Sequence, residues 1–261
     1  MVRRRPPHKA DPTGYLSPAR PRVFAHRGLA VDAPENTMLA FARAVAAGAE
    51  YIETDVHASS DGAAIIAHDP VLSRVAGSNL RVDQFTRAEL EKVDLGYGQS
   101  FCTLAQALDG FPETRFNIDV KSAAAVAPTI ATIVALGASR RVLVTSFDER
   151  RRAAAVRGVP EVASSASAAR LIPALVAAQL GILPLVRWAV RGLVAVQVPE
   201  TAAGVRVTKP RLIRMFHAVG VEVHVWTVND PRRMRELLDL GVDGIITDRA
   251  DLALEVVRLR S

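Results

Sequence analysis

The sequence predicts a (β/α)₈ barrel with a small insertion after its second strand. From residue 21 onward, short runs rich in β-branched and aromatic residues alternate with alanine-rich helical runs, the pattern of a parallel sheet wrapped by helices. Eight such units in about 240 residues match the size of this barrel. A doubly wound open sheet is the alternative, but the first unit lacks the G-x-G-x-x-G loop that such sheets use for dinucleotides.

The expected strands follow one another at the spacing of β/α units. They cover residues 22–26, 51–57, 115–121, 141–146, 162–165, 193–198, 222–228 and 244–247. Helical runs between them cover residues 36–47, 123–136, 148–156, 166–186, 210–219, 231–240 and 249–258. About 55 residues separate the second strand from the third, more than one crossover helix needs, so a hairpin and an insertion of mixed structure are expected there, the insertion at about 70–101. Residues 1–20 are predicted to be a mobile basic arm and 21–261 to be the barrel.

Composition sets the class of protein and its compartment. With 49% hydrophobic residues in 261, the chain can bury a full-sized core, which excludes a disordered chain. The single cysteine, Cys102, excludes an internal disulfide and any cysteine-based zinc site. The longest nearly apolar stretch, residues 171–186, contains Pro173, Gly181 and Pro184 and is shorter than the roughly 20 residues of a membrane span, so it predicts a buried, bent helix. The N-terminal segment lacks the apolar region of a signal peptide, so we expect a cytoplasmic protein.

The net charge of +6 would permit binding to nucleic acid, to anionic membrane surfaces or to phosphorylated small molecules. Almost all of the excess is arginine, scattered through alanine-rich segments, and no nucleic-acid-binding motif is present. We therefore expect no nucleic-acid partner.

Polar residues collect at the predicted carboxyl ends of the strands, where barrel enzymes place their active sites. Glu53 and Asp55 lie two residues apart on one strand and therefore share a face, as do Asp119 and Lys121 on the next. Three carboxylates pointing into one cavity would repel one another, so such a cluster usually holds a cation. Oxygen ligands favour magnesium, calcium or manganese over zinc. The alternative is that these acids pair with arginines or face solvent.

A hairpin signal brings a histidine to the same place. Asp61-Gly62, between strand 51–57 and the alternating run 63–67, suits a two-residue type I′ turn. Paired positions then sum to 123, so Asp55 would lie opposite His68 and on the same face. His26, at the end of the first strand, would join it in the cavity. The other histidines are expected to be structural or on the surface: His8, His57, His217 and His224.

Two histidines beside a cation and two basic side chains form a coherent phosphoryl-transfer site. The cation, Arg27 and Lys121 would hold the non-bridging oxygens of a phosphate ester. The histidines, which titrate near neutrality, would act as base on the attacking hydroxyl and as acid on the leaving alcohol.

Seven motifs in order resemble the signature of the glycerophosphodiester phosphodiesterase family, from residue 23 to about 255. They are His26-Arg27-Gly28, Pro34-Glu35-Asn36-Thr37, Glu53-Thr54-Asp55-Val56, Ser60-Asp61-Gly62 with His68-Asp69, Asn117-Ile118-Asp119-Val120-Lys121, Trp226-Thr227-Val228-Asn229 and the run from Gly241 to Asp248. The resemblance implies a TIM barrel with an insertion after the second strand. It also implies metal-dependent hydrolysis of glycerophosphodiesters to glycerol 3-phosphate and an alcohol, by enzymes of which some act on lysophospholipids.

The resemblance also implies roles for individual residues. His26 and His68 would be the acid/base pair, and Glu53, Asp55 and Asp119 the metal ligands, for a divalent cation such as Mg²⁺, Ca²⁺ or Mn²⁺. Arg27 and Lys121 would contact phosphate, Glu35 would support the first loop and the glycerol, and Trp226 would wall the pocket, unless it is a core aromatic. Asp119 departs from the family, which more often has glutamate there, and Cys102-Thr103-Leu104 replaces the commoner Pro-Thr-Leu.

Two other functions remain open at this point. A barrel that binds phosphate esters or lipid headgroups without turnover is favoured only by Asp119. Lysophospholipase D activity at a membrane is favoured by the apolar stretch 171–186, which has Arg170 before it and Arg187 and Arg191 after it. Such a stretch would give weak association with an anionic lipid surface, whereas a buried crossover helix would not. The headgroup, the native cation and the oligomeric state are left undetermined.

Overall fold

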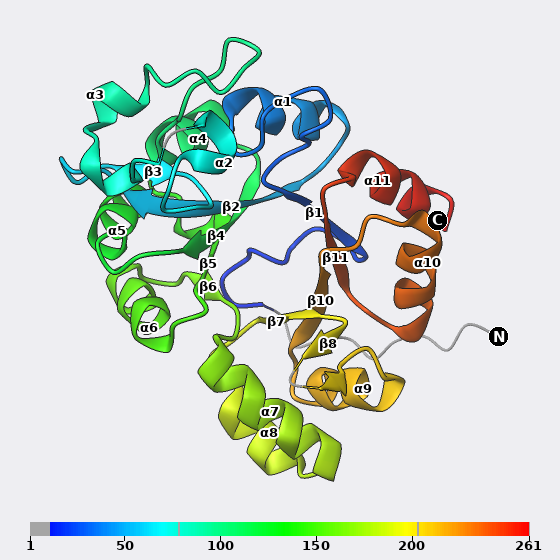
Figure 1. Cartoon of the computed structure of the whole chain (residues 1–261). Coiled ribbons are helices and arrows are strands. Elements are labelled where there is room, and N and C mark those ends of the chain that lie inside the picture. The colour runs from blue at the N-terminus through cyan, green and yellow to red at the C-terminus, as the bar shows by residue number, and fades with distance from the viewer. Residues whose placement is uncertain (1–10, 78, 203, 261) are drawn as a thin grey trace.

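The computed structural model describes residues 11–77, 79–202 and 204–260. Eight parallel strands form a nearly closed barrel in the order β6-β5-β4-β2-β1-β11-β10-β7 (Figure 1). Main-chain pairing between Ser165 and Ala195, with the amide of Val194 donating to the carbonyl of Ser164 at 3.0 Å, links the two ends of this order. The strands are β1 (Arg22–His26), β2 (Tyr51–Ala58), β4 (Arg115–Val120), β5 (Val142–Thr145), β6 (Ala163–Ser164), β7 (Ala195–Pro199), β10 (Glu222–Trp226) and β11 (Gly244–Thr247). The predicted barrel is confirmed.

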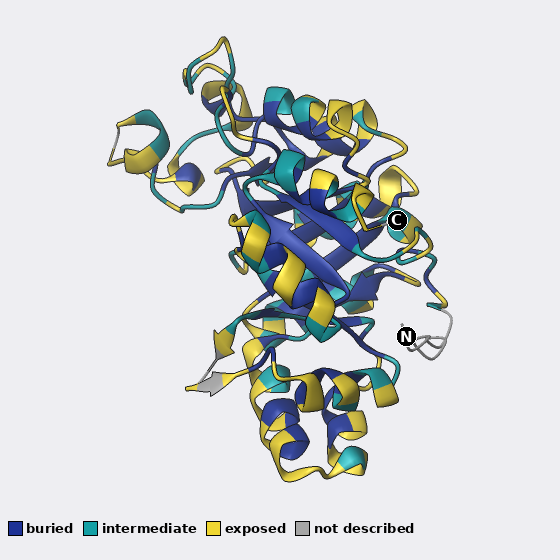
Figure 2. Ribbon diagram, turned by 90° about the vertical axis from the view of Figure 1, so that its right-hand side faces the viewer, coloured by how far each residue is buried: buried dark blue, intermediate teal, exposed yellow. Residues whose placement is uncertain are grey.

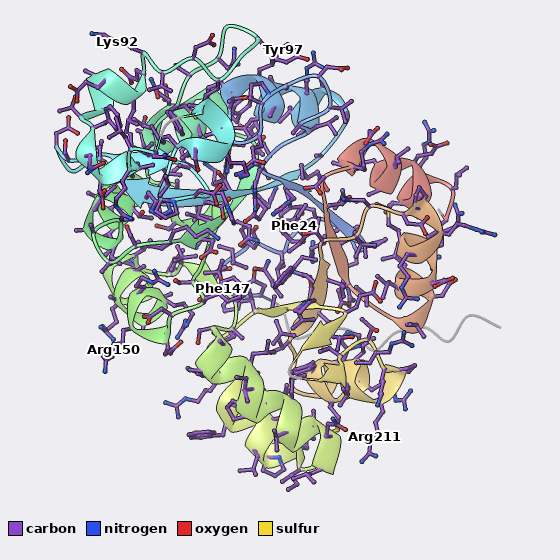
Figure 3. The ribbon with its side chains drawn as sticks, in the orientation of Figure 1. Phe24, Lys92, Tyr97, Phe147, Arg150 and Arg211 are labelled. Carbon is purple, nitrogen blue, oxygen red and sulfur yellow. The ribbon has the colours of Figure 1, made fainter. Side chains whose placement is uncertain are left out.

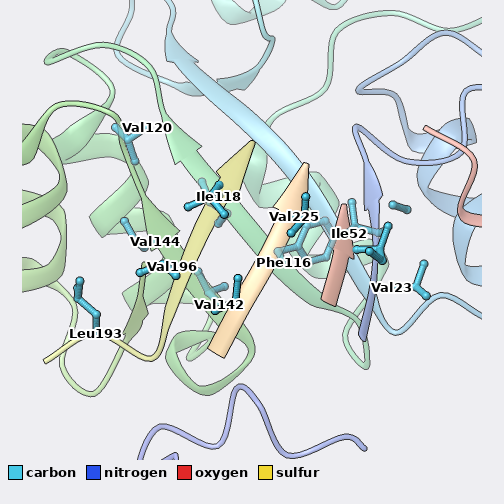
Figure 4. Close-up of a cluster of buried hydrophobic side chains, with 14 of the residues drawn as sticks. Val23, Ile52, Phe116, Ile118, Val120, Val142, Val144, Leu193, Val196 and Val225 are labelled. Carbon is cyan, nitrogen blue, oxygen red and sulfur yellow. The ribbon is translucent and has the colours of Figure 1, made fainter. Parts of the chain in front are cut away.

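Helices surround the barrel and bury one face against it. They are α1 (Met38–Ala46), α4 (Leu104–Gly110), α5 (Val126–Ala135), α6 (Glu149–Gly158), α7 (Ala168–Leu180), α8 (Leu183–Ala189), α9 (Pro210–Ala218), α10 (Pro231–Leu240) and α11 (Ala250–Arg258). Several begin at side-chain caps, such as Asp148 before α6 and Asp230 before α10, each accepting a hydrogen bond from a first-turn amide. Strand residues such as Ile52, Phe116 and Val196 form the core between the two layers (Figure 4).

The long connection between β2 and β4 contains a hairpin and a small insertion. β3 (Ala64–Ile66) pairs antiparallel with β2, and α2 (Ser73–Ala76), the 3₁₀ turn η1 (Val82–Gln84) and α3 (Arg87–Leu90) follow. These segments bury a separate apolar cluster that includes Leu72, Leu90 and Phe101.

The hairpin register differs from the expected one by a single residue. Val56 lies opposite Ile66, so paired positions sum to 122 and Ala67, not His68, is the neighbour of Asp55, to whose carbonyl it donates a hydrogen bond of 3.0 Å. The cause is the loop: Ser59 pairs with Ala63, leaving three loop residues of which Gly62 is left-handed at φ 79°. His68 therefore lies beyond the end of β3.

Residues 11–20 pack against the amino-terminal end of the barrel. Tyr15 is fully buried and packs edge-on against Tyr51 at 5.4 Å between ring centroids. Arg22 donates to the carbonyl oxygens of Leu16 and Pro18. The mobile arm expected over residues 1–20 is therefore wrong for residues 11–20, and its first half lies outside the described residues.

The apolar stretch expected to be one buried, bent helix is a pair of helices, α7 and α8. Gly181 ends α7 in a left-handed conformation at φ 79°, and α8 folds back beside α7. Buried residues lie on the inner side of this hairpin and exposed ones on its outer edge (Figure 2). No helix in the described ranges is long and apolar enough to cross a membrane. A short hairpin, β8 (Thr201–Ala202) and β9 (Val205–Arg206), follows β7.

Candidate active site

A cavity of about 410 Å³ lies at the carboxyl ends of the barrel strands. Eight of the nine residues singled out from the sequence line it: His26, Arg27, Glu53, Asp55, His68, Asp119, Lys121 and Trp226. Glu35 is absent from its lining. His57, His217 and His224 do not line it either, and His8 lies outside the described residues.

The turn after β1 fixes Arg27 over β2. Arg27 and Gly28 both have left-handed backbone angles, at φ 57° and 84°. A Cβ on Gly28 would lie 2.7 Å from the carbonyl carbon of Ala40 in α1, so no other residue fits the turn. The amide of Arg27 donates to the carbonyl of Glu53 at 2.9 Å. These contacts hold the His26-Arg27 pair against Glu53.

His26 lies between two carboxylates. Its Nδ1 is 2.6 Å from Oδ1 of Asp248, and its Nε2 is 3.8 Å from Oε2 of Glu53. Asn229 donates to the other Asp248 oxygen at 2.7 Å. Burial alone would lower the pKa of His26, but the bond to Asp248 and the charge of Glu53 outweigh it and raise this pKa.

Asp248 and Asn229 were not identified as site residues from the sequence. Both belong to motifs quoted for the family resemblance, and that was the available signal. Their role depends on contacts between β1, the loop after β10 and the end of β11, which the motifs alone do not specify.

His68 has the same kind of partner as His26. Its Nδ1 is 2.7 Å from Oδ1 of Asp69, whose second oxygen accepts from Nε of Arg74 at 2.5 Å. Burial would raise the pKa of Asp69, but the hydrogen bonds with Arg74 and His68 outweigh burial and lower it. Each cavity histidine therefore has a carboxylate on Nδ1.

Lys121 joins two of the three cavity carboxylates. Its Nζ is 2.9 Å from Oδ1 of Asp55 and 2.7 Å from Oδ2 of Asp119. Burial would raise the pKa of Asp55, but Lys121 and Arg27, whose Nε is 3.4 Å away, outweigh burial and lower it. For Asp119, the effect of burial is larger than the opposing effect of the Lys121 charge, so the pKa of this carboxyl group is raised.

Asn36 supports this group from the loop before α1. Its Nδ2 donates to Oδ2 of Asp55 at 3.1 Å, and its Oδ1 accepts from the hydroxyl of Thr54 at 2.8 Å. Asn36 has φ 56°, a conformation that asparagine adopts more readily than most residues.

The donor set suits a hard cation. Oδ1 of Asp119 and Oδ1 of Asn117 are buried and have no hydrogen-bond partner among the described residues. Burial, reinforced by the charge of Asp55, holds the pKa of Glu53 well above its ordinary value, so this carboxylate lacks sufficient positive charge nearby. The described side chains do not, however, form a ready group of three or more metal-binding residues. Lys121 instead lies between Asp55 and Asp119.

Glu35 lies behind Arg27, outside the cavity lining. It accepts from Nη1 of Arg27 at 2.9 Å and from both Nη atoms of Arg74 at 2.7 and 2.9 Å. Burial would raise the pKa of Glu35, but the two guanidinium groups lower it. The contacts make Glu35 a support for Arg27 and a link to the insertion.

The rest of the cavity wall is largely apolar. Trp226 packs edge-on against Phe147 with ring centroids 6.1 Å apart, and Phe147 projects near the centre of the barrel mouth (Figure 3). From α7, the wall receives Ala168, Leu171, Ile172 and Leu175. The cavity thus has a charged floor and an apolar side.

Comparison with known proteins places the chain in a family. The model of the "Glycerophosphoryl diester phosphodiesterase family" matches residues 26–252. A probable glycerophosphodiester phosphodiesterase 2 of Mycobacterium tuberculosis is 44% identical over 240 residues, 91% of each chain. A glycerophosphodiester phosphodiesterase of Caldanaerobacter subterraneus is 30% identical, over 90% of this chain and 97% of its own. The crystal structure of a glycerophosphodiester phosphodiesterase from Agrobacterium tumefaciens superposes with a TM-score of 0.76 at 26% identity, covering 91% of this chain and 99% of that one. The chain therefore belongs to the glycerophosphoryl diester phosphodiesterase family of enzymes.

Proposed function

We propose that the cavity hydrolyses glycerophosphodiesters to glycerol 3-phosphate and an alcohol, with His26 and His68 as the acid/base pair. The observation that carries this proposal is that both histidines, Arg27 and Lys121 line one cavity with three carboxylates. The names of the relatives at 44% and 30% identity support it.

The reaction requires one proton to leave the nucleophile and one to reach the leaving group. One histidine accepts the proton of the attacking hydroxyl, from water or from the substrate's own glycerol, as the new P–O bond forms. The other gives a proton to the alcohol oxygen as its bond to phosphorus breaks. When the glycerol hydroxyl is the nucleophile, this step leaves a cyclic glycerol phosphate, and water then opens the ring to give glycerol 3-phosphate, with the two histidines exchanging their roles. Asp248 and Asp69, each on an Nδ1, orient the two rings for these transfers.

Basic side chains and a cation would stabilise the negative charge on the phosphate oxygens. Arg27 and Lys121 would bind the non-bridging oxygens. Glu53, Asp55 and Asp119 would hold Mg²⁺, Ca²⁺ or Mn²⁺, and the buried oxygen of Asp119 without a partner supports this. A bound cation supplies positive charge to the phosphate oxygens. Lys121 then contributes to binding both the carboxylates and the substrate.

A panel of substrates and cations tests the proposal. Purified protein is given glycerophosphocholine or glycerophosphoethanolamine with each cation, and released glycerol 3-phosphate is measured. Release that depends on a cation supports the hydrolase. Binding of the same compounds without release would support the alternative, a barrel that binds phosphate esters without turnover.

A second candidate, lysophospholipase D activity, is favoured by the apolar side of the cavity. Phe147 and the α7 residues Leu171 and Ile172 could accommodate an acyl chain beside the phosphate site. Release of choline from lysophosphatidylcholine is the test.

The proposal also covers the extent of the catalytic domain and the compartment in which the enzyme acts. We infer one catalytic domain over residues 21–261, with the insertion at about 70–101 supporting Arg27 through Arg74 and the Glu35 carboxylate that both guanidinium groups contact. The single cysteine, which is buried, suits a cytoplasmic enzyme of glycerol and lipid metabolism.

A further inference from the structure

Exposed hydrophobic side chains are concentrated on the α7–α8 hairpin. Of the fourteen large hydrophobic side chains that are exposed among the described residues, six lie between residues 172 and 188. These six, here called the hairpin patch, have exposed fractions of 40–69%: Ile172, Val176, Leu180, Ile182, Leu185 and Trp188. An exposed apolar group of this size on a helix pair marks an interaction surface.

The patch continues the apolar side of the cavity. Residues four apart share a helix face, so Ile172, Val176 and Leu180 form one stripe along α7. Ala168, one turn earlier, and Ile172 line the cavity. The stripe therefore runs from the cavity to the tip of the hairpin.

Charge around the patch is positive. Residues 162–199 contain three arginines and no aspartate or glutamate. Arg211, at the start of α9, extends to Gly181 at the tip of the hairpin: its Nη2 would lie 2.9 Å from a Cβ placed on this glycine. Arg150 and Arg211 lie on the two sides of the hairpin in the view of Figure 3. In the described part of the chain neither of these two guanidinium groups forms an ion pair with a carboxylate, whereas Arg170 pairs with Glu149 at 3.6 Å.

We propose that the hairpin patch docks on the surface of an anionic lipid bilayer, which places the cavity mouth beside the lipid headgroups. Aliphatic side chains and a tryptophan flanked by arginines, without acidic residues, have the chemistry of helices that lie in the membrane interface. A second copy of this chain is a poorer occupant, because a two-fold contact would bring the positive surroundings of the patch against themselves.

Docking itself does not depend on the chemistry of the cavity, whereas delivery of a lipid substrate rests on the proposed function. A lysophospholipid held in the bilayer would enter with its headgroup toward Lys121 and its acyl chain along the apolar wall. Binding and catalysis are therefore measured separately.

Vesicle co-sedimentation tests docking directly. Vesicles of phosphatidylcholine with 30% phosphatidylglycerol, and of phosphatidylcholine alone, are mixed with wild-type protein and with the double variant Val176→Gln/Leu180→Gln. The matched control is Val134→Gln, on α5, whose side chain is 51% exposed against 55% for Val176. Hydrolysis of water-soluble glycerophosphocholine, the melting temperature and the mass in solution are measured for every variant.

Docking predicts that wild type and Val134→Gln sediment with the anionic vesicles and that the double variant binds at least about tenfold more weakly, with unchanged melting temperature. Arg211→Gln should weaken binding about fivefold, from about 1 kcal/mol per arginine near an anionic surface. Equal sedimentation of wild type and double variant, or no sedimentation of wild type, would overturn the proposal. The proposal would also be overturned if the wild-type protein were a dimer and the double variant a monomer, because a second copy of the chain would then cover the hairpin patch. Vesicle binding without glycerol 3-phosphate release would contradict the proposed hydrolysis and leave docking standing.

Discussion

Replacing Asp248 by asparagine should lower turnover without weakening substrate binding. In the structure a carboxylate oxygen lies 2.6 Å from Nδ1 of His26, and the other accepts from Nδ2 of Asn229 at 2.7 Å. An asparagine cannot satisfy both neighbours. With its oxygen toward His26, its amide faces the Asn229 amide; turned over, its amide donates to His26 and selects the wrong tautomer.

The size of the effect follows from the exposure of this pair. A hydrogen bond to a charged group contributes about 1.5–3 kcal/mol. Because the Asp248 side chain is 49% exposed, solvent screens its bond to His26, and we expect a contribution at the lower end of this range. We expect kcat to fall about tenfold from this loss, and up to about a hundredfold if the wrong tautomer prevails. KM should stay within about twofold, because Asp248 does not line the cavity.

The assay is steady-state release of glycerol 3-phosphate from glycerophosphocholine. Asp251→Asn is the control, since this nearby carboxylate of α11 pairs with Arg249 instead of a histidine. A kcat for Asp248→Asn within twofold of wild type, or an equal loss in the control, would refute the role of Asp248 in positioning His26.

Three further predictions concern the metal, acid stability and the first turn. Asp119→Asn should weaken activation by the cation about 10–100-fold, whereas Asp119→Glu should stay within about tenfold of wild-type activity; equal cation titrations for both variants and wild type would remove Asp119 from the ligands. Burial would raise the pKa of Glu222, but hydrogen bonds with His224 and Arg22 outweigh burial and lower this pKa to about 2. The ionised Glu222 side chain therefore stabilises the folded protein fully above about pH 4.5, and this stabilisation is lost as the pH falls toward 2. Glu222→Gln should therefore cost about 3 kcal/mol in urea unfolding at pH 7 and flatten that acid limb, and an unchanged limb would contradict the assignment. Gly28→Ala should lower both the melting temperature and kcat, since its Cβ would meet the α1 backbone at 2.7 Å; a variant as stable and active as wild type would show that the turn can shift.

The strands could be predicted because their signal is local. Residues 22–26 and 244–247 are short runs of apolar and β-branched residues bounded by turn residues, and both are strands with the expected limits. The hairpin register was wrong by one residue because Asp61-Gly62 fits both a two-residue and a three-residue loop. Only the pairing of Ser59 with Ala63 distinguishes the two.

The remaining differences come from contacts between distant parts of the chain. Asp248 is 222 residues from His26, so its role depends on β1 and β11 being neighbours. The stretch 171–186 has an apolar composition that cannot separate a buried helix from one with an exposed apolar face. The resemblance implies that Glu35 supports the first loop and the glycerol, and the sequence does not specify that two arginines from different segments hold it behind the cavity lining.

Turnover of glycerophosphocholine by wild type, His26→Ala and His68→Ala tests the central claim most directly. If the two histidines divide the proton transfers, each alanine variant keeps the wild-type melting temperature and loses at least about a hundredfold in kcat. Near wild-type turnover by either folded variant would contradict the two-histidine site.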